Sequence, residues 1–241
     1  MLENKKAIIF DLDGTLIDSV GVWNKVDEKL IKEIKTIEFD NVNISKQRDE
    51  KLKEYSNCKD AYLEYCGFLK EKYKSKISKE DIKKRRYEIA DKYLKEEIDY
   101  KPNAENVLKY LKEKGFILVI ASTTNDHAIE NYKKYNKNII NKANFEDIFS
   151  LIYSKESVEK LKPNPEIHYK ILENLKLKPE ECLIVEDSLI GVEAANNANI
   201  DVAVIYDKYS DNDRASINKL SKYQFKNFYE MLDYLKKELG N

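Results

Sequence analysis

The chain of 241 residues has little of what builds metal clusters, disulfide frameworks or flexible linkers. Three cysteines without a CxxC spacing and only two histidines argue against a disulfide framework and a zinc site, and they favour a reducing compartment. Six glycines and four prolines leave no low-complexity linker. Because 43 basic residues face 44 acidic ones, no charge excess draws in nucleic acid or an anionic membrane, and we expect neither as a partner.

Long apolar runs are also absent. The N-terminal run, at residues 7–10, is too short for a signal peptide or a membrane span, so we expect a soluble, cytoplasmic protein. The chain length suits one α/β core that carries a smaller insert. The sequence does not indicate the oligomeric state, and a monomer is compatible with it.

Short apolar runs rich in Ile, Val and Phe recur along the chain. They predict buried parallel strands at residues 7–10, 116–121, 149–153, 182–185 and 202–206. Helical patterns between or after these runs predict helices at residues 103–114, 165–175 and 191–197. Asn164 is the predicted N-cap of the helix at 165–175, and Asn227 is the predicted N-cap of a C-terminal helix. This alternation predicts an α/β fold with a Rossmann-like, doubly wound parallel sheet.

Residues 19–100 interrupt that alternation with a long helical stretch rich in Lys, Glu and Tyr. A parallel crossover needs only about a dozen residues, so the surplus predicts an α-helical cap domain at 19–100, inserted into a catalytic core made of 1–18 and 101–241. The basic run at residues 83–86 is interpreted as a solvated helix face, because acidic residues flank it. Residues 41–48 and 55–65 show no substrate motif.

A string of polar residues, Asp11 to Thr15, follows the first predicted strand directly. Asp11 and Asp13 are two residues apart, which turns both carboxylates to one side of the strand. Gly14 permits a sharp turn, and the exposed amides there can approach a phosphate, so Gly14 and Thr15 are candidate phosphate-binding residues. An EF-hand loop does not fit, because its sixth and twelfth positions would be leucine and valine here. The simpler alternative is that these Asp and Gly residues only mark the end of a strand.

A second acidic pair, Glu186 and Asp187, closes another predicted strand. In an open parallel sheet the carboxyl ends of the strands form one crevice, so this pair should meet Asp11 there. Like charges about 4 Å apart cost on the order of 4 kcal/mol at an effective dielectric near 20, so such a cluster recruits a cation or holds a proton. Oxygen ligands favour Mg²⁺. Taken alone, the pair could equally be a solvated loop.

Further polar residues follow other predicted strands. Lys162 precedes a proline, which gives it a stiff, extended segment, and its cation could offset phosphate charge. Ser122 and Thr123 offer donors to phosphate, or alternatively cap the next helix. His168 is expected at the surface and His127 in a loop, and no nucleophilic triad is supported.

These motifs in this order resemble the four ordered motifs of the haloacid dehalogenase superfamily. The resemblance covers nearly the whole chain and is closest to the branch of phosphoglycolate phosphatase-like enzymes and β-phosphoglucomutase, which carries a helical cap after the first motif. The residues that carry it are Asp11-Leu12-Asp13-Gly14-Thr15, Ser122, Leu161-Lys162-Pro163-Asn164-Pro165 and Val185-Glu186-Asp187-Ser188.

The resemblance implies a role for each matched residue. Asp11 would be the nucleophile that forms an aspartyl-phosphate, and Asp13 the general acid and then the base. Ser122 would hold the phosphate and Lys162 would neutralise the phosphoaspartate. The Mg²⁺ ligands would be Asp11, the main-chain carbonyl of Asp13, and Asp187 helped by Glu186.

The function implied is a Mg²⁺-dependent phosphatase for a small phosphorylated metabolite, such as a sugar phosphate. A mutase of the β-phosphoglucomutase type is the first alternative, although Trp23 occupies the place of the cap histidine that such mutases carry. A phospho-receiver module is disfavoured because its acidic pair precedes the phosphorylated aspartate. A ligand-binding protein without turnover is the remaining alternative.

Overall fold

The computed structural model describes residues 1–37, 44–55, 58 and 60–240. The chain divides into two compact units, which we call the core unit (Met1–Ser19 with Ile98–Asn241) and the helical unit (Val20–Glu97). The helical unit therefore begins one residue after the start of the predicted cap domain at 19–100 and ends three residues before its end. Part of the 41–48 stretch lies outside the described residues.

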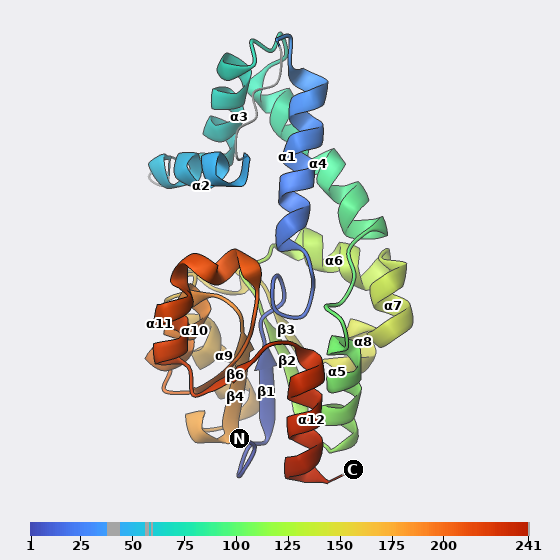
Figure 1. Ribbon diagram of the computed structural model, residues 1–241, viewed down its shortest axis with the longest axis vertical. Coiled ribbons are helices and arrows are strands. Elements are labelled where there is room, and N and C mark those ends of the chain that lie inside the picture. The colour runs from blue at the N-terminus through green and yellow to red at the C-terminus, as the bar shows by residue number, and fades with distance from the viewer. Residues whose placement is uncertain (38–43, 56–57, 59, 241) are drawn as a thin grey trace. The chain divides into compact units, whose positions relative to one another are not determined.

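A parallel sheet of six strands forms the centre of the described core unit, in the order β3-β2-β1-β4-β5-β6 (Figure 1). The central strands are buried along nearly their whole length, as expected when helices cover both faces of a parallel sheet. This confirms the predicted α/β fold. The strands are β1 (Ala7–Phe10), β2 (Ile117–Ala121), β3 (Leu151–Tyr153), β4 (Cys182–Glu186), β5 (Asp201–Ile205) and β6 (Tyr223–Phe225).

Helices cover both faces of this sheet. Figure 1 shows α9 (Glu166–Leu175), α10 (Leu189–Asn197) and α11 (Arg214–Leu220) on one side, and α5 (Ala104–Glu113) and α12 (Phe228–Leu239) on the other. Three short helices between β2 and β3 were not predicted: α6 (Asp126–Lys134), α7 (Lys137–Ala143) and α8 (Phe145–Ile148).

The two predicted N-caps have different outcomes. Asn227 caps α12, because its side chain accepts a hydrogen bond from the amide of Glu230 at 3.0 Å. At α9 the N-cap residue is Pro165, one position later than predicted. The Asn164 side chain still accepts from the first helical amide, that of Glu166, at 3.0 Å.

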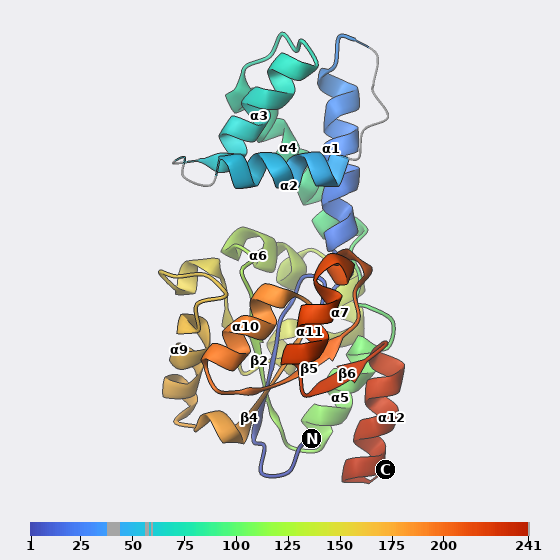
Figure 2. The ribbon, with the colours of Figure 1, turned by 60° about the vertical axis from the view of Figure 1, so that its left-hand side comes forward.

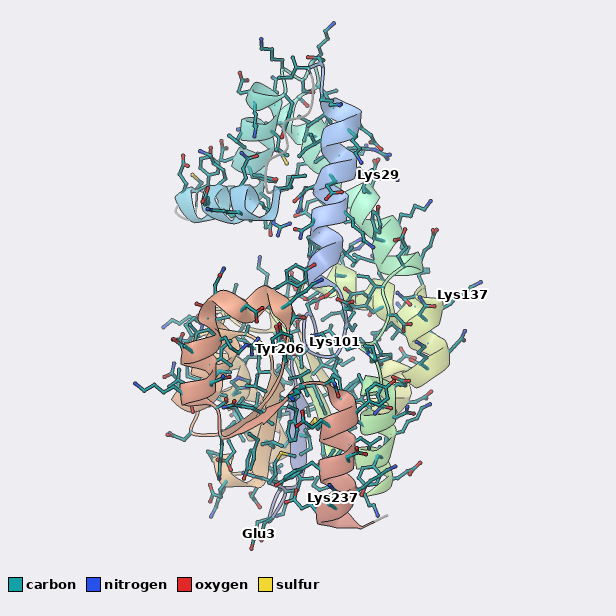
Figure 3. The ribbon with its side chains drawn as sticks, in the orientation of Figure 1. Glu3, Lys29, Lys101, Lys137, Tyr206 and Lys237 are labelled. Carbon is teal, nitrogen blue, oxygen red and sulfur yellow. The ribbon has the colours of Figure 1, made fainter. Side chains whose placement is uncertain are left out.

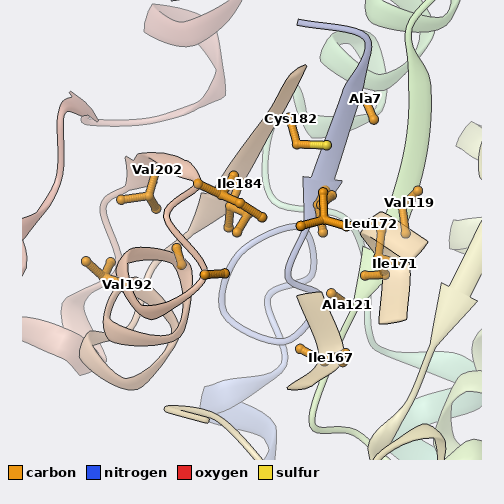
Figure 4. Packing of buried hydrophobic residues seen from close by; sticks show 14 of the residues in the cluster. Ala7, Val119, Ala121, Ile167, Ile171, Leu172, Cys182, Ile184, Val192 and Val202 are labelled. Carbon is orange, nitrogen blue, oxygen red and sulfur yellow. The ribbon is translucent and has the colours of Figure 1, made fainter. Parts of the chain in front are cut away.

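Aliphatic side chains from the strands and helices form one buried cluster in the core unit (Figure 4). Ile184 of β4 and Val202 of β5 pack there with Ile171 of α9 and Val192 of α10. Each such side chain contributes about 1.5–3 kcal/mol of stability when it leaves water. Cys182 belongs to the same cluster, and burial raises the pKa of its thiol to about 11. The thiol is therefore protonated and inert.

Four helices make up the described part of the helical unit (Figure 2): α1 (Val20–Ile34), α2 (Ile44–Glu54), α3 (Ala61–Lys72) and α4 (Lys79–Glu96). Asp60 and Ser78 cap α3 and α4 by accepting hydrogen bonds from the amides of Leu63 and Asp81. Among the described residues, no helix of either unit combines the length and the apolar character that a membrane crossing requires.

The interpretation of residues 83–86 as a solvated face is wrong for Arg86, which is only 2% exposed. Its Nε donates to Oδ1 of buried Asp27 at 2.7 Å, and Nη1 of Arg48 donates to Oδ2 at 3.2 Å. The Arg86 guanidinium also lies 4.8 Å from the ring centroid of Trp23 and 5.0 Å from that of Tyr62. One carboxylate thus holds two guanidinium groups inside the helical unit.

The expectation of a surface position for His168 is also wrong, because the residue is fully buried. It lies on the inward face of α9, three and four residues before buried Ile171 and Leu172. Burial, and secondarily the charge of Lys162, lower the pKa of His168 to about 3. His127, by contrast, is exposed, and it lies in α6 rather than in a loop.

The buried imidazole predicts a specific loss of stability in acid. Its folded pKa lies below the unfolded value near 6.5, so as the pH falls below about 6.5 the unfolded chain binds a proton that the folded protein does not. Between pH 7 and about pH 5.5, wild type should lose about 1 kcal/mol more unfolding free energy than His168→Phe. Urea titrations at both pH values measure the difference. A His127→Gln protein should keep the wild-type loss, and equal losses for wild type and His168→Phe would contradict the prediction.

Candidate active site

The strand register brings three polar segments to one edge of the sheet. Phe10 of β1 lies opposite Ile120 of β2 and Val185 of β4. The residues just beyond these positions therefore leave the sheet together, and the amide of Asp11 donates to the carbonyl of Val185 at 2.9 Å. This is the crevice at the carboxyl ends of the strands where α/β proteins bind ligands.

Three carboxylates meet there: Asp11, Glu186 and Asp187 are all buried, and one oxygen of each lies within 4.8 Å of the others. Lys162 reaches them from the segment before α9. Its Nζ lies 2.8 Å from Oδ1 of Asp11 and 2.7 Å from Oε1 of Glu186. Burial alone would lower the pKa of Lys162, but these two carboxylates raise it above its usual range. The amine is therefore a permanent cation between two acids.

When all three acids are ionised, the cluster carries more negative than positive charge, because a single ammonium faces three carboxylates. Burial, followed by the charge of Glu186, raises the pKa of Asp11 well above its usual value. The same two causes raise the pKa of Asp187 to about 7, although a hydrogen bond from Thr15 opposes them. A buried set of oxygen donors with this excess of charge fits a hard divalent cation such as Mg²⁺.

Glu186 is the most constrained of the three acids. Its Oε2 accepts hydrogen bonds from the amide of Asp187 at 2.9 Å and from the amide and hydroxyl of Ser188 at 3.1 and 3.0 Å. Its other oxygen holds Lys162. Both oxygens are thus engaged, so the side chain orients the lysine and supports the cluster.

Gly191, in the first turn of α10, makes room for this carboxylate. A Cβ at this position would lie 1.7 Å from Oε1 of Glu186, so Gly191→Ala must displace the side chain that holds Lys162. If the chain has the phosphatase activity that its sequence predicts, we expect kcat/KM to fall by about 10²-fold, since small displacements of positioned groups have effects of that size.

The control for this prediction is Gly67→Ala in α3, where the nearest atom to a new Cβ is the Cδ of Lys79 at 3.4 Å. Replacing a helical glycine there should leave activity unchanged and raise stability by about 0.5–1 kcal/mol. Steady-state kinetics and thermal unfolding of both variants provide the test. If Gly191→Ala keeps the kcat/KM of wild type, the position of the Glu186 side chain does not matter for activity, which would contradict the prediction.

Asp13 lies apart from the other acids. Gly14 has a φ of 89°, which lets the chain turn sharply so that the amides of Leu16 and Ile17 both donate to the carbonyl of Leu12. The Asp13 carboxylate faces a group of hydroxyls instead of the carboxylate cluster. Its donors are Ser19, Thr124 and Tyr132, the last at 3.1 Å.

The residues predicted to bind phosphate have varied surroundings. The buried hydroxyl of Thr15 donates to Oδ1 of Asp187 at 2.6 Å, so its side chain orients an acid and only its amide is left for phosphate. Ser122 is buried at the end of β2, and its Oγ accepts from the amide of Thr124 at 3.1 Å. Thr123 is half-buried beside it. Their phosphate-binding role stays a prediction.

An ion pair lies on the Asp187 side of the cluster. Nζ of Lys101 is 2.6 Å from Oδ2 of Asp207 and 3.5 Å from the carbonyl of Tyr206, and Figure 3 labels Lys101 and Tyr206 side by side. The Lys101 charge lowers the pKa of Asp187 and the Asp207 charge raises it, so the two members of the ion pair act on Asp187 in opposite directions. Neither Lys101 nor Asp207 was predicted from the sequence as a site residue.

Comparison with known proteins agrees with this geometry. Residues 8–205 match the family described as haloacid dehalogenase-like hydrolases. The chain belongs to this family. The match includes the segments of Asp11, Lys162 and Glu186-Asp187, so the predicted resemblance is confirmed.

Individual relatives cover most of the chain. A phosphorylated carbohydrates phosphatase of Thermotoga maritima is 27% identical over 197 residues, covering 81% of this chain and 82% of the relative. A phosphoglycolate phosphatase of Aquifex aeolicus is 29% identical over 203 residues, covering 83% and 84%. The crystal structure of a candidate β-phosphoglucomutase from Thermotoga maritima has a TM-score of 0.78 at 24% identity and covers 96% of this chain and 99% of that one. The last similarity concerns the fold.

Proposed function

We propose that this haloacid dehalogenase-like hydrolase is a Mg²⁺-dependent phosphoric monoester hydrolase that acts on a small phosphorylated metabolite through an aspartyl-phosphate. The observation that carries the proposal is the buried cluster of Asp11, Glu186 and Asp187, with the Lys162 amine 2.8 Å from the proposed nucleophile. The names of the relatives, a carbohydrate-phosphate phosphatase and a phosphoglycolate phosphatase, support this class of substrate.

In the first half of the proposed reaction, a carboxylate oxygen of Asp11 attacks phosphorus. The bond from phosphorus to the ester oxygen breaks, and Asp13 gives its proton to that departing oxygen, so a neutral alcohol leaves. Lys162, which already contacts Asp11, offsets the charge gathered on the phosphoryl group.

In the second half, Asp13 acts as the base. It takes a proton from water while the water oxygen attacks phosphorus, and the bond from phosphorus to the Asp11 oxygen breaks. Orthophosphate leaves and both aspartates return to their first state. General acid and base catalysis of this kind contributes about 10²–10⁴-fold.

The proposed Mg²⁺ ligands are Asp11, Asp187 and the main-chain carbonyl of Asp13, with Glu186 supporting the cluster. Asp11 and Asp187 are the better side-chain ligands, because Glu186 has both oxygens engaged with Lys162 and with nearby donors. When bound, the ion would supply positive charge that offsets the phosphate and the buried acids.

The helical unit, which corresponds to the predicted cap at 19–100, is proposed to cover the substrate and to determine its identity. We also propose a cytoplasmic setting, because three cysteines without a CxxC spacing favour a reducing compartment.

A phosphosugar mutase is the second candidate, since the fold is also that of a β-phosphoglucomutase-like protein. The ring of Trp23, at the place of the mutase histidine, stacks on Arg86 and has no group that can exchange a proton at neutral pH. Phosphorus-31 NMR of a hexose 1-phosphate reaction separates the two. Orthophosphate as the product supports hydrolysis, and conversion to the 6-phosphate supports the mutase.

Phosphate release tests the main proposal. The protein is incubated with phosphoglycolate, sugar phosphates, nucleotides and cofactor phosphates, first with Mg²⁺, then with EDTA, and then with Mg²⁺ restored. We expect at least one small phosphomonoester to be hydrolysed, with a loss of about 100-fold or more in EDTA that is reversed by Mg²⁺. A protein that binds these compounds and releases no phosphate from any of them would contradict the proposal.

A further inference from the structure

Three hydroxyl groups surround the carboxylate of Asp13 in the core unit. Ser19 Oγ and Tyr132 Oη donate to Oδ1, the latter at 3.1 Å, and Thr124 Oγ1 donates to Oδ2. A carboxylate has about four lone-pair positions, so three donors leave about one for another partner. The carboxylate is thus held from several sides while it retains one position for proton transfer.

Tyr132 differs from the other two donors in how it is anchored. Ser19, which is also 1% exposed, ends the first segment of the core unit, and half-buried Thr124 lies in the loop after β2. Tyr132 is 1% exposed and lies inside α6. Its ring packs edge-on against buried Phe145, with centroids 6.4 Å apart and planes at 63°. Because the core fixes the ring, the position of its hydroxyl does not depend on a loop.

We propose that Tyr132 is a positioning residue of this active site, whose hydroxyl holds the Asp13 carboxylate in the orientation that proton transfer requires. The inference rests on the proposed function, in which Asp13 first protonates the departing oxygen and then deprotonates water. Neither step tolerates a carboxylate that turns freely, because each needs the proton-transferring oxygen within hydrogen-bond reach of its partner.

The test compares Tyr132→Phe with wild type on p-nitrophenyl phosphate in the presence of Mg²⁺. Nitrophenolate leaves without needing a proton, so phosphorylation of Asp11 proceeds without help from Asp13. Hydrolysis of the aspartyl-phosphate still needs the base. We expect kcat to fall about tenfold while kcat/KM, which reports phosphorylation of Asp11, stays within about twofold, so that KM falls together with kcat. A burst of one nitrophenolate per protein should precede the slow steady state.

Tyr100→Phe is the matched control. Tyr100 packs edge-on against the same Phe145, with centroids 6.3 Å apart, and its buried hydroxyl donates to the carbonyl of Ala143 at 2.6 Å. The Tyr100→Phe protein also loses a hydrogen bond from a buried tyrosine hydroxyl, but this bond does not involve Asp13. Its kcat should therefore stay within about twofold of wild type. In an Asp13→Asn background, Tyr132→Phe should cause no further loss, because its effect acts through Asp13.

The possible results distinguish the proposed function of the protein from the proposed role of Tyr132. Wild-type protein that hydrolyses no phosphomonoester would overturn the proposed function and this role of Tyr132 with it. If wild type is active, three results overturn the role of Tyr132 alone: an unchanged kcat in Tyr132→Phe, an equal loss in Tyr100→Phe, or a burst well below one equivalent. The last result would mean that phosphorylation of Asp11 is itself impaired or that fewer sites are folded, and either contradicts an effect that acts through the base step.

Discussion

An Asp11→Asn protein is expected to release phosphate at less than about one thousandth of the wild-type rate, because an amide oxygen cannot replace the attacking carboxylate. The substitution keeps the size of the side chain and leaves an oxygen that can still accept from Lys162, 2.8 Å away. Phosphate release is measured on the best substrate from the panel, in Mg²⁺. Activity equal to wild type would rule out Asp11 as the nucleophile.

The same variant should not be less stable than wild type when divalent ions are absent. Asp11 is one of three buried carboxylates around a single ammonium, and burial together with Glu186 already raises its pKa. Removing one of these charges relieves repulsion. Adding Mg²⁺ should raise the melting temperature of wild type more than that of Asp11→Asn, because the variant loses a ligand.

Asp201→Asn is the control for this experiment. Asp201 begins β5, at the edge of the sheet opposite the site, and pairs with Lys5 and Lys222. Its substitution should leave both the rate of phosphate release and the response to Mg²⁺ unchanged. A loss of activity in Asp201→Asn comparable to that in Asp11→Asn would show that the assay reports folding instead of chemistry.

The largest effect on stability is expected for Asp27→Asn in the helical unit. Asp27 is fully buried and accepts from both Arg86 and Arg48, which are 2% and 9% exposed. Without the carboxylate, two guanidinium groups remain in a site from which water is largely excluded. Breaking a buried ion pair by removing one partner costs about 3–5 kcal/mol.

The protein contains a single tryptophan, Trp23, which stacks on Arg86. Its fluorescence during urea denaturation therefore reports unfolding of the helical unit. Glu33→Gln provides a control on the same two helices, because Glu33 of α1 pairs with Arg85 of α4 at the surface, where Arg85 is 44% exposed. Water screens such a pair, so the urea midpoint should stay where it is in wild type. Equal midpoints for Asp27→Asn and wild type would contradict the prediction.

Much of the core could be predicted from local patterns. A strand buried on both faces needs an unbroken apolar run, which is visible in residues 7–10, 117–121 and 182–185 without knowledge of their neighbours. Strand β6 was missed because its three residues, Tyr-Gln-Phe, include a polar one, and only pairing with β5 makes them a strand. Helices α6 to α8 were missed because they are short and their caps are asparagines within a polar region.

The burial of polar residues could not be predicted in the same way. Arg86 follows three other basic residues, and nothing in that run distinguishes it until α1 brings Asp27 to it. His168 has apolar neighbours three and four positions later, a helical spacing that could have indicated a buried face. The hydroxyls of Ser19, Thr124 and Tyr132 gave no signal, although Thr124 directly follows the predicted pair Ser122-Thr123.

The sequence by itself determined the strands, the order of the acidic and basic motifs, and the family, because these depend on residue type and on spacing along the chain. Only the tertiary structure decided which carboxylates share a cluster and which stands apart. Asp11 and Asp13 are two residues from each other, yet one joins Glu186 and Asp187 while the other faces three hydroxyls. The sharp turn at Gly14 and contacts more than a hundred residues away in the chain cause that difference, and no local pattern encodes them.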